Sequence, residues 1–329
     1  MNRPVKAEGP FFNELAVGQT FPPVPGVTLT DGLAAAHQAI VGNRLALSLD
    51  GELARAVTGG ARLASPALVW DVAIGQSTVA THHVKANLFY RGLWFHRAPV
   101  IGDTLRSTTT VAALRQNRPR PGRAPTGLAA LRITTVDQDQ RPVLDFWRCA
   151  MLPLREAADA AGPPGPADDL DQVGAGVREG DVGALLDGWK LDTLPRSGPA
   201  AADLRPGEVI EVIGGDVVSS APELARLTLN VALVHHDAAA AGGRRLVYGG
   251  HTIGLALTQA ARALPGLVTV LGWHSCDHLA PVHEGDTLHS TVEVETLAPR
   301  AAGYVAELRS RVFCGPEQVL DWRFVAVLS

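Results

Sequence analysis

The sequence predicts an α+β protein in which two antiparallel sheets each wrap around a central helix, arranged as a tandem repeat of one domain. Three segments of the first half recur in the second half, in the same order and at similar spacings. Repetition of this kind indicates a duplicated structural unit. The pairs are LAVGQTF (15–21) with LRPGEVI (204–210), PVIGDTLRSTTTV (99–111) with PVHEGDTLHSTVEV (281–294), and VLDFWRCAMLP (143–153) with VLDWRFVAVLS (319–329).

Each copy runs through the same predicted elements. A short strand precedes a helical stretch at 31–41 in the first copy and at 221–230 in the second, and an irregular loop follows. A helix rich in small apolar residues comes next, at 66–76 and at 251–264. The later stretches, such as TLRSTTTVAAL and TLHSTVEVETL, alternate in polarity as antiparallel strands do. One central helix followed by a run of strands favours the α+β class.

The repeat also divides the chain into domains. A length of 329 residues allows two of them, and we assign residues 1–155 to the first and 203–329 to the second. Residues 156–202 are rich in Ala, Gly, Pro and Asp, which predicts a linker. The alternative is an ordered arm packed across both domains, with GALLDGWKL at 183–191 as its anchor.

Bulk composition excludes several classes of partner. The net charge of −4 provides no basic surface for nucleic acid. No apolar run approaches the roughly 20 residues of a membrane span, and the start, MNRPVKAEGPFFNEL, lacks the apolar core of a signal peptide. Cys149, Cys276 and Cys314 show no paired spacing, so neither a disulfide framework nor a cysteine zinc site is expected. We therefore expect a cytoplasmic protein with no nucleic-acid or membrane partner.

Side chains suited to chemistry are concentrated in the second copy. It carries VHHD, YGGH and WHSCDH where the first copy carries ALSL, LASPA and GLWFH. This asymmetry predicts that one copy acts and the other supports it. Several His and two Asp would also suit a mononuclear zinc or iron site, although the HHD run lacks the helical i, i+4 spacing of metal ligands.

The GDTL segment after a Pro-Val pair, with a buried helix before it, resembles the hot-dog fold, and two tandem copies resemble the MaoC-like double hot-dog hydratases. FFNELAVGQTF, ALRQN, VHHD with RRLVYGGHTIGLA, and the His278-to-Pro281 motif look like the mesaconyl-CoA hydratase (β-methylmalyl-CoA dehydratase) branch. The wider family has Asp, then Asn two residues on, then His five residues from the Asp. This branch begins the motif with Asn, as Asn230 and His235 do here, while Ala232 takes the middle position.

The resemblance implies a hydro-lyase that reversibly hydrates an α,β-unsaturated acyl-CoA to a 3-hydroxyacyl-CoA. CoA is then part of the substrate, and neither a separate cofactor nor a metal is required. The chain departs from the branch at Asp277, where a basic residue is expected.

Four residues carry the predicted chemistry. His235 is the leading base, because a neutral imidazole with a pKa near ~6.5 can accept a proton from water and return it within one turnover; a hydrogen-bonded core histidine is the alternative. Asn230 would hold water or substrate through its amide, or cap a helix end. Gly249 and Gly250 precede a helix, where a thioester oxygen can approach backbone N–H groups, or they only turn the chain.

Supporting roles are predicted for four neighbours. His251, at the helix start, would lie behind the base, and Asp237 would orient an imidazole or cap the stretch that follows it. Because Asn230 stands where the wider family has an Asp, the acid of the family motif is missing, and Asp277 is, after Asp237, a second candidate for that role. His278 matches His96 of the first copy, which favours a structural role.

Arginines are candidates for binding the anionic parts of a substrate. Arg244 and Arg245 would meet CoA phosphates, or form a solvated turn. A carboxylate on the acyl group would need a cation in the pocket, for which Arg44, Arg91 and Arg97 are candidates.

The first copy is expected to support the site. Asn43 and Ser48 occupy the positions of Asn230 and His235, and Ser48 has no neighbouring base with which to shuttle a proton. Two other functions stay open: a hot-dog thioesterase that directs water at the carbonyl, and a non-catalytic acyl-CoA binder. A homodimer or a higher homo-oligomer is also possible for this fold.

Overall fold

The computed structural model describes residues 7–22, 24–155, 165–174, 185–194, 201–300 and 303–329. In this part of the chain, one twelve-stranded sheet runs in the order β1-β4-β5-β6-β3-β9-β12-β11-β10-β7, with β2 paired to β4 and β8 paired to β10. The first copy contributes β1 (Thr20–Phe21), β2 (Val27–Thr28), α1 (Asp31–Val41), α2 (Ala46–Leu49), α3 (Gly51–Thr58), α4 (Pro66–Ser77), β3 (Ala86–Phe95), β4 (Thr104–Gln116), β5 (Thr126–Val136) and β6 (Pro142–Pro153). The second contributes β7 (Val209–Glu211), β8 (Asp216–Val217), α6 (Ala221–Leu227), the 3₁₀ turn η6 (Leu233–His235), α7 (Gly249–Ala263), β9 (Leu267–His278), β10 (Thr287–Arg300), β11 (Gly303–Cys314) and β12 (Glu317–Leu328).

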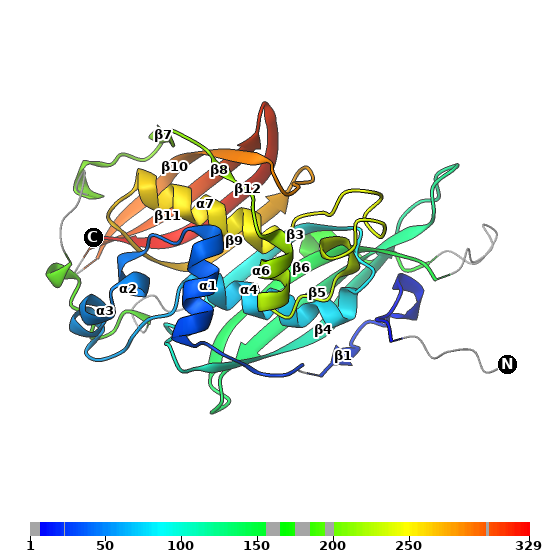
Figure 1. The fold of residues 1–329 in the computed structure, drawn as a ribbon, viewed down its shortest axis with the longest axis horizontal. Coiled ribbons are helices and arrows are strands. Elements are labelled where there is room, and N and C mark those ends of the chain that lie inside the picture. The colour runs from blue at the N-terminus through cyan, green and yellow to red at the C-terminus, as the bar shows by residue number, and fades with distance from the viewer. Residues whose placement is uncertain (1–6, 23, 156–164, 175–184, 195–200, 301–302) are drawn as a thin grey trace.

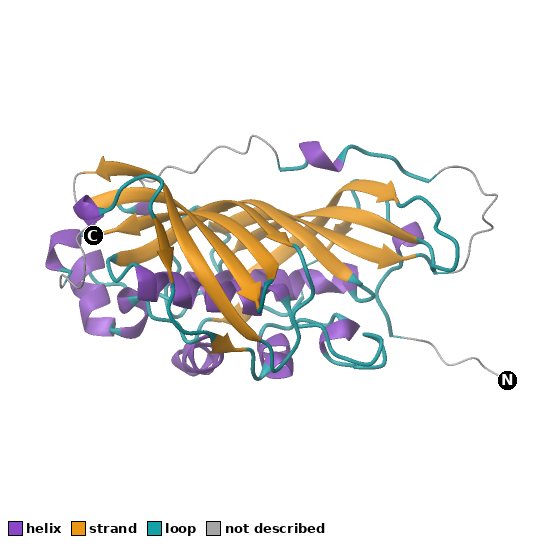
Figure 2. Ribbon diagram, turned by 90° about the horizontal axis from the view of Figure 1, so that it is seen from above, coloured by secondary structure: helices purple, strands orange, loops and turns teal. Residues whose placement is uncertain are grey.

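The structure is a double hot-dog fold whose two predicted sheets are joined into one. Strands β3 and β9 pair antiparallel at the middle, with Phe89 opposite Asp277 and Leu93 opposite Trp273. Figure 1 shows the first copy's strands on one side of this seam and the second copy's on the other. Figure 2 shows the sheet as one layer, α4 and α7 against one face of it, and α1 and α6 outside those helices.

The two central helices are buried because the sheet covers one side of them and other helices cover the rest. Every residue of α4 is buried, which explains why its sequence shows no polar face. Close approach between copies requires glycine at two points. A Cβ on Gly75 would lie 1.9 Å from the backbone oxygen of Thr228, and one on Gly250 would lie 1.9 Å from Asp71 Oδ1.

The predicted helices at 31–41, 66–76 and 251–264 are confirmed within two residues. The helix predicted at 221–230 ends earlier, at Leu227. Its chain then turns through Leu229, whose φ of 58° is left-handed. This turn directs Asn230 toward the other copy instead of extending the helix.

The described pieces of the predicted linker form an ordered arm. Gln116 N donates to Pro166 O at 2.7 Å, and Leu114 N donates to Asp168 Oδ2 at 2.8 Å. Leu170 is buried in a small apolar cluster with Phe89. Figure 2 shows this piece crossing the sheet face opposite the helices. Residues 183 and 184 of the predicted anchor lie outside the described residues, whereas Leu185 and Leu191 pack into the main core. The domain boundaries at 155/156 and 202/203 stay predictions.

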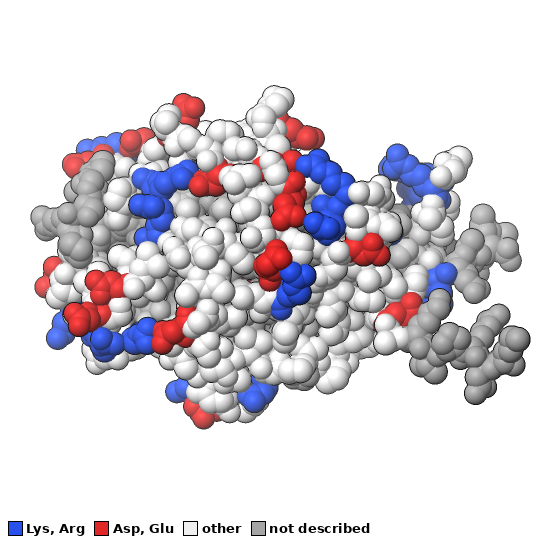
Figure 3. All heavy atoms as spheres, viewed as in Figure 1, with Lys and Arg blue, Asp and Glu red and all other residues white. Residues whose placement is uncertain are grey.

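The surface shows no single extended charged field on the face of Figure 3, where Lys and Arg are interspersed with Asp and Glu. Among the described residues, no helix combines the length and the apolar character needed to cross a bilayer.

Candidate functional site

A cavity of about 370 Å³ lies between the two copies. Its walls come from the end of α4, strands β3 and β6, the loop that contains η6, the start of α7 and the end of β9. The polar side chains and the glycine on which the argument below depends are Thr78, Lys85, Asn87, Tyr90 and Arg148 from the first copy, and Asn230, His235, Tyr248, Gly249 and His278 from the second.

His235 is held in one tautomer. Its Nδ1 lies 2.8 Å from the carbonyl oxygen of Leu246, and since a carbonyl can only accept, Nδ1 carries the proton. The neutral ring therefore keeps its lone pair on Nε2. Burial lowers the pKa of His235 to about 4, against a raising effect of the Leu246 bond and with smaller lowering effects of His236 and Arg148. The imidazole is consequently neutral near pH 7 and ready to accept a proton.

Asn230 presents a free amide to the same cavity. Its Oδ1 accepts from Ala232 N at 3.0 Å, which fixes the turn before η6. Its buried Nδ2 has no partner among the described residues. A buried donor without an acceptor is costly unless a ligand or water completes it. The oxygen therefore stabilises a turn and caps no helix end, unlike the alternative predicted for it, while the Nδ2 group is available to hold water or substrate.

The first copy holds this catalytic loop in place. Val231 N donates to Thr78 Oγ1 at 2.9 Å, and Leu233 N donates to His82 O at 3.0 Å. Within the loop, His236 Nε2 donates to Asn230 O at 2.6 Å. The first copy thus fixes the backbone that directly follows Asn230.

The start of α7 supplies backbone donors. Tyr248 precedes the helix, and within the described chain neither Gly249 N nor Gly250 N has an acceptor. Gly249 lines the cavity, and a Cβ there would lie 2.7 Å from His278 Nε2 and 3.3 Å from Tyr90 Oη. Gly250 does not line the cavity; its missing side chain leaves room for Asp71 of the other central helix. The two glycines therefore differ: Gly249 opens an amide to a ligand, and Gly250 permits packing of α7 against α4.

A buried polar network supports the helix start from behind. Tyr248 Oη donates to Asp71 O at 3.0 Å, and His37 Nε2 lies 2.9 Å from Asp71 Oδ2. Burial raises the pKa of Asp71, although the His37 bond opposes this effect. Burial likewise raises the pKa of Tyr248 well above its usual range, so its hydroxyl stays protonated. The Tyr248 ring stands edge-on to His235, with centroids 5.9 Å apart.

The structure separates the other predicted residues from the cavity. His251 is fully buried behind it, and burial lowers its pKa to about 4. Asp237 is exposed and caps the next turn by accepting from Ala239 N at 2.8 Å, as its alternative role foresaw. Asp277 lies one residue before His278 on β9 and so faces the other side of the sheet; burial raises its pKa.

Arg244 and Arg245 form ion pairs outside the cavity lining, and their contact with CoA phosphates stays a prediction. Arg244 pairs with Asp286 at 2.9 Å, and Arg245 pairs with Glu284 at 3.2 Å. These pairs cross about 40 residues of sequence, which is why local reading of the loop did not reveal them.

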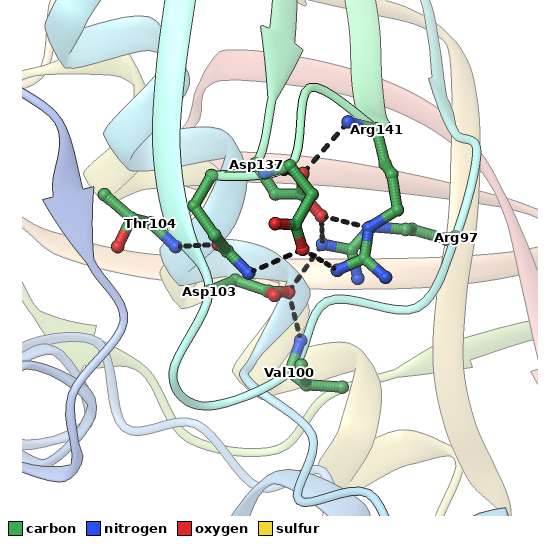
Figure 4. Close-up of polar contacts among 8 residues, drawn as sticks. Arg97, Val100, Asp103, Thr104, Asp137 and Arg141 are labelled. Carbon is green, nitrogen blue, oxygen red and sulfur yellow. Dashed lines mark hydrogen bonds and ion pairs between the residues drawn. The ribbon is translucent and has the colours of Figure 1, made fainter.

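The three arginines proposed for a substrate carboxylate also lie elsewhere. Arg44 is exposed outside the cavity lining. Arg91 Nη1 donates to Leu170 O at 3.1 Å, on the arm side of the sheet. Figure 4 shows Arg97 bound between Asp103 and Asp137, at 2.8 and 2.7 Å.

His278 was matched to the wrong residue of the first copy. Leu320 pairs with His278 across the sheet, whereas the equivalent Leu144 pairs with Phe95. The counterpart of His278 is therefore Phe95 and not His96, which is half exposed and lies 3.2 Å from Asp145. His278 lines the cavity, its Nε2 has no partner in the described residues, and burial lowers its pKa to about 4.

Sequence reasoning missed Tyr90, Tyr248, Lys85 and Arg148, all of which line the cavity. Three of them belong to the first copy, in which the sequence had suggested only Arg44, Arg91 and Arg97 as pocket residues. Only Arg148 left a signal, because the repeat aligns it with Phe324. No three His, Cys, Asp or Glu side chains among the described residues converge as a metal site.

Comparison with known proteins agrees with this geometry. No protein-family model matches the chain. Mesaconyl-CoA hydratase of Cereibacter sphaeroides is 30% identical over 92% of this chain and 88% of its own length. β-Methylmalyl-CoA dehydratase of Chloroflexus aurantiacus is 28% identical over 87% of this chain and 82% of its own.

The similarity extends to a solved three-dimensional structure. A conserved Mycobacterium tuberculosis protein with a double hot-dog fold is 54% identical, with a TM-score of 0.90 over 99% of this chain and 100% of its own. Sequence relatives over nearly the full length and a shared double hot-dog fold lead to one conclusion. The chain belongs to the mesaconyl-CoA hydratase family, has a double hot-dog fold, and is a hydro-lyase.

Proposed function

We propose that this protein adds water reversibly to the carbon–carbon double bond of a short α,β-unsaturated acyl-CoA, with His235 moving the proton. One observation supports this assignment above the others. The free Nε2 of His235 shares a cavity with two unpaired donors, Asn230 Nδ2 and Gly249 N–H, and none of the lining residues is Asp or Glu.

The steps follow from these atoms. His235 Nε2 takes a proton from water as the oxygen attacks the β-carbon, and the electron pair of the double bond moves toward the thioester oxygen. The Gly249 N–H at the helix start stabilises this enolate oxygen. His235 then returns its proton to the α-carbon, and the enolate reverts to the thioester. Asn230 Nδ2 orients the water through a neutral hydrogen bond.

A single imidazole that takes and returns one proton delivers H and OH to the same face of the double bond. The rival mechanism uses Asp237 or Asp277 as a separate acid. Neither carboxylate lines the cavity, and Asp277 faces the opposite side of the sheet, which favours the single-histidine shuttle.

The substrate proposal extends to the acyl group and to CoA. The relatives named above carry mesaconyl-CoA and β-methylmalyl-CoA in their names, and a short, branched enoyl-CoA suits a cavity of about 370 Å³. Lys85 is an exposed cation on the cavity lining and is placed to meet CoA phosphates. We also propose a cytoplasmic location, no cofactor beyond the CoA of the substrate, and a homodimer or larger homo-oligomer, which light scattering of the purified protein would test.

The decisive experiment incubates purified protein with crotonyl-CoA and with mesaconyl-CoA. Hydration removes the enoyl absorbance without releasing a thiol, and the product has the mass of the substrate plus water. Release of free CoA would instead identify a thioesterase. Saturable binding with neither change would identify an acyl-CoA binder.

A further inference from the structure

Arg148 brings a positive charge into the cavity, and no carboxylate of the described residues pairs with it. Its side chain is only 2% exposed. One nitrogen, Nη2, donates to Thr81 Oγ1 at 2.6 Å and to Ser77 O at 3.3 Å, both neutral acceptors. Its Nε has no partner among the described residues. A buried cation without a counter-ion is strongly unfavourable, so such a group is kept for a reason other than stability.

The internal repeat shows that the fold does not require an arginine here. Arg148 pairs with Tyr90 across the sheet, and its equivalent Phe324 pairs with Trp273. Phe324 is fully buried and stacks on Trp322, with ring centroids 3.9 Å apart. The same inward position of the same strand is thus a core aromatic residue in one copy and a charged residue in the other.

The position of Arg148 indicates which anion would bind it. It lines the cavity together with His235 and Tyr248, deep between the copies, whereas the exposed Lys85 lies where CoA would leave the protein. CoA phosphates are bulky and hydrated, and they suit the exposed cation. A carboxylate is small and planar, and it fits a guanidinium through paired hydrogen bonds.

We propose that Arg148 is the specificity-determining residue of this enzyme and binds the free carboxylate that the acyl group of a mesaconyl-CoA-like substrate carries. This inference rests on the proposed hydration function. It replaces the three arginines that the sequence had suggested with a residue from the strand that faces the reacting end of the cavity.

The test compares substrates that differ only in the carboxylate. For the wild-type protein, kcat/KM should be much higher with fumaryl-CoA or mesaconyl-CoA than with crotonyl-CoA. In Arg148→Met this preference should fall at least about 100-fold, as expected when a buried charge pair loses one member, while the rate with crotonyl-CoA stays within about threefold. Arg148→Lys should recover part of the preference, because it restores the charge without the planar fork.

Two controls keep the result interpretable. Arg148→Phe copies the residue of the other copy, so it should fold and should lose the preference as Arg148→Met does. Arg132→Gln removes an exposed arginine of the neighbouring strand that pairs with Asp145, and should change neither rate. Equal losses with charged and neutral substrates in the Arg148 variants, or no preference in the wild type, would overturn the proposal.

A binding measurement separates this inference from the proposed function. Succinyl-CoA and butyryl-CoA are saturated and cannot be hydrated, so calorimetry with them measures binding affinity without any reaction. The wild-type protein should bind succinyl-CoA at least about tenfold more tightly, and Arg148→Met should abolish the difference. That outcome would support Arg148 even if no enoyl-CoA were hydrated. A preference that persists in Arg148→Met would refute it even if hydration were confirmed.

Discussion

The two copies use the same backbone turn with different side chains. Asn43 Oδ1 accepts from Leu45 N at 3.2 Å, just as Asn230 Oδ1 accepts from Ala232 N at 3.0 Å. After this shared turn the first copy carries Ser48 where the second carries His235. The framework of the site is therefore present twice, but the proposed proton carrier is present once.

The helix starts differ in the same way. Leu63 pairs with Val100 and Leu246 pairs with His283, which makes Pro66 the equivalent of Gly249. Proline has no N–H, so the first copy has no donor at the position where the second copy offers one to a thioester oxygen. Conversely, Thr78 and Arg148 of the first copy line the second copy's cavity. The first copy thus lacks the side chains proposed for the chemistry and instead forms part of the wall of the second copy's cavity.

Removal of the proposed base, His235, should produce the largest difference in hydration rate between matched variants of the two copies. His235→Ala should lower the hydration rate at least about 100-fold, the lower end for loss of general acid–base help. Ser48→Ala should stay within a few-fold, because Ser48 is only the positional counterpart. Steady-state rates, with circular dichroism to verify folding, provide the measurement. Similar losses in both folded variants would show that the copies share the chemistry.

Acid should destabilise the protein through the second copy. His251 is fully buried and its pKa is lowered by burial from 6.5 to about 4, whereas its counterpart is Leu68. Below pH 6.5 His251 is protonated in the unfolded chain but stays neutral in the folded chain. The free energy of unfolding is therefore highest above this pH and falls as the pH drops toward 4. For His251 alone the loss at pH 5 is up to about 2 kcal/mol. Urea unfolding at pH 7.5 and 5 should show this loss, and His251→Leu should reduce it; an unchanged pH dependence in His251→Leu would contradict the assignment.

Closing the backbone donor should have a smaller effect. In Gly249→Ala the new methyl group would meet His278 Nε2 at 2.7 Å and push the ring into the cavity. We expect kcat/KM to fall about tenfold, the scale of one weakened hydrogen bond to the developing charge. Pro66→Ala is the matched variant of the first copy and should leave the rate unchanged. If the two variants behave alike, the helix start of the second copy does not bind the thioester oxygen.

A change of charge beside the base should move the pH profile more than the maximal rate. In Asn230→Asp a carboxylate next to His235 stabilises the imidazolium and raises its pKa from about 4. The acidic limb of the profile should therefore shift upward by about one pH unit or more. Asn230→Ala should slow the reaction without moving this limb. An unshifted limb in Asn230→Asp would count against the single-histidine shuttle and in favour of a separate acid.

The fold was predictable because its signals are local or repeated. The segments around GDTL and VLD fixed the duplication, and the apolar stretches placed both central helices within two residues. His235 and Asn230 were found for a similar reason, since they lie only five positions apart in one loop that reaches the cavity. What could not be predicted was the pairing of distant segments.

Two residues illustrate what could not be predicted from the sequence. The second copy has one more residue between its Pro-Val pair and GDTL (281–288 against 99–105), so matching the His-x-x-Pro letters joined His278 to His96. Only the strand register shows that Phe95 is the equivalent. Arg148 lies on β6, which ends only a few residues before the predicted linker begins, in the copy without a base. Its role depends on how β6 faces a loop more than 80 residues later, which the sequence does not encode locally.

The covalent joining of the copies through one chain changes what a single substitution can do. In a dimer of identical hot-dog units, every residue appears on both sides of the twofold axis. An arginine at the position of Arg148 would therefore be buried in both units, and so would an aromatic residue such as Phe324. Here one gene holds two versions of that position. The half with Phe324 can keep its interior apolar while the half with Arg148 bears the electrostatic penalty at one place. Tandem duplication therefore lets selection act on each half separately, and asymmetry becomes available at the cost of a second, unused site.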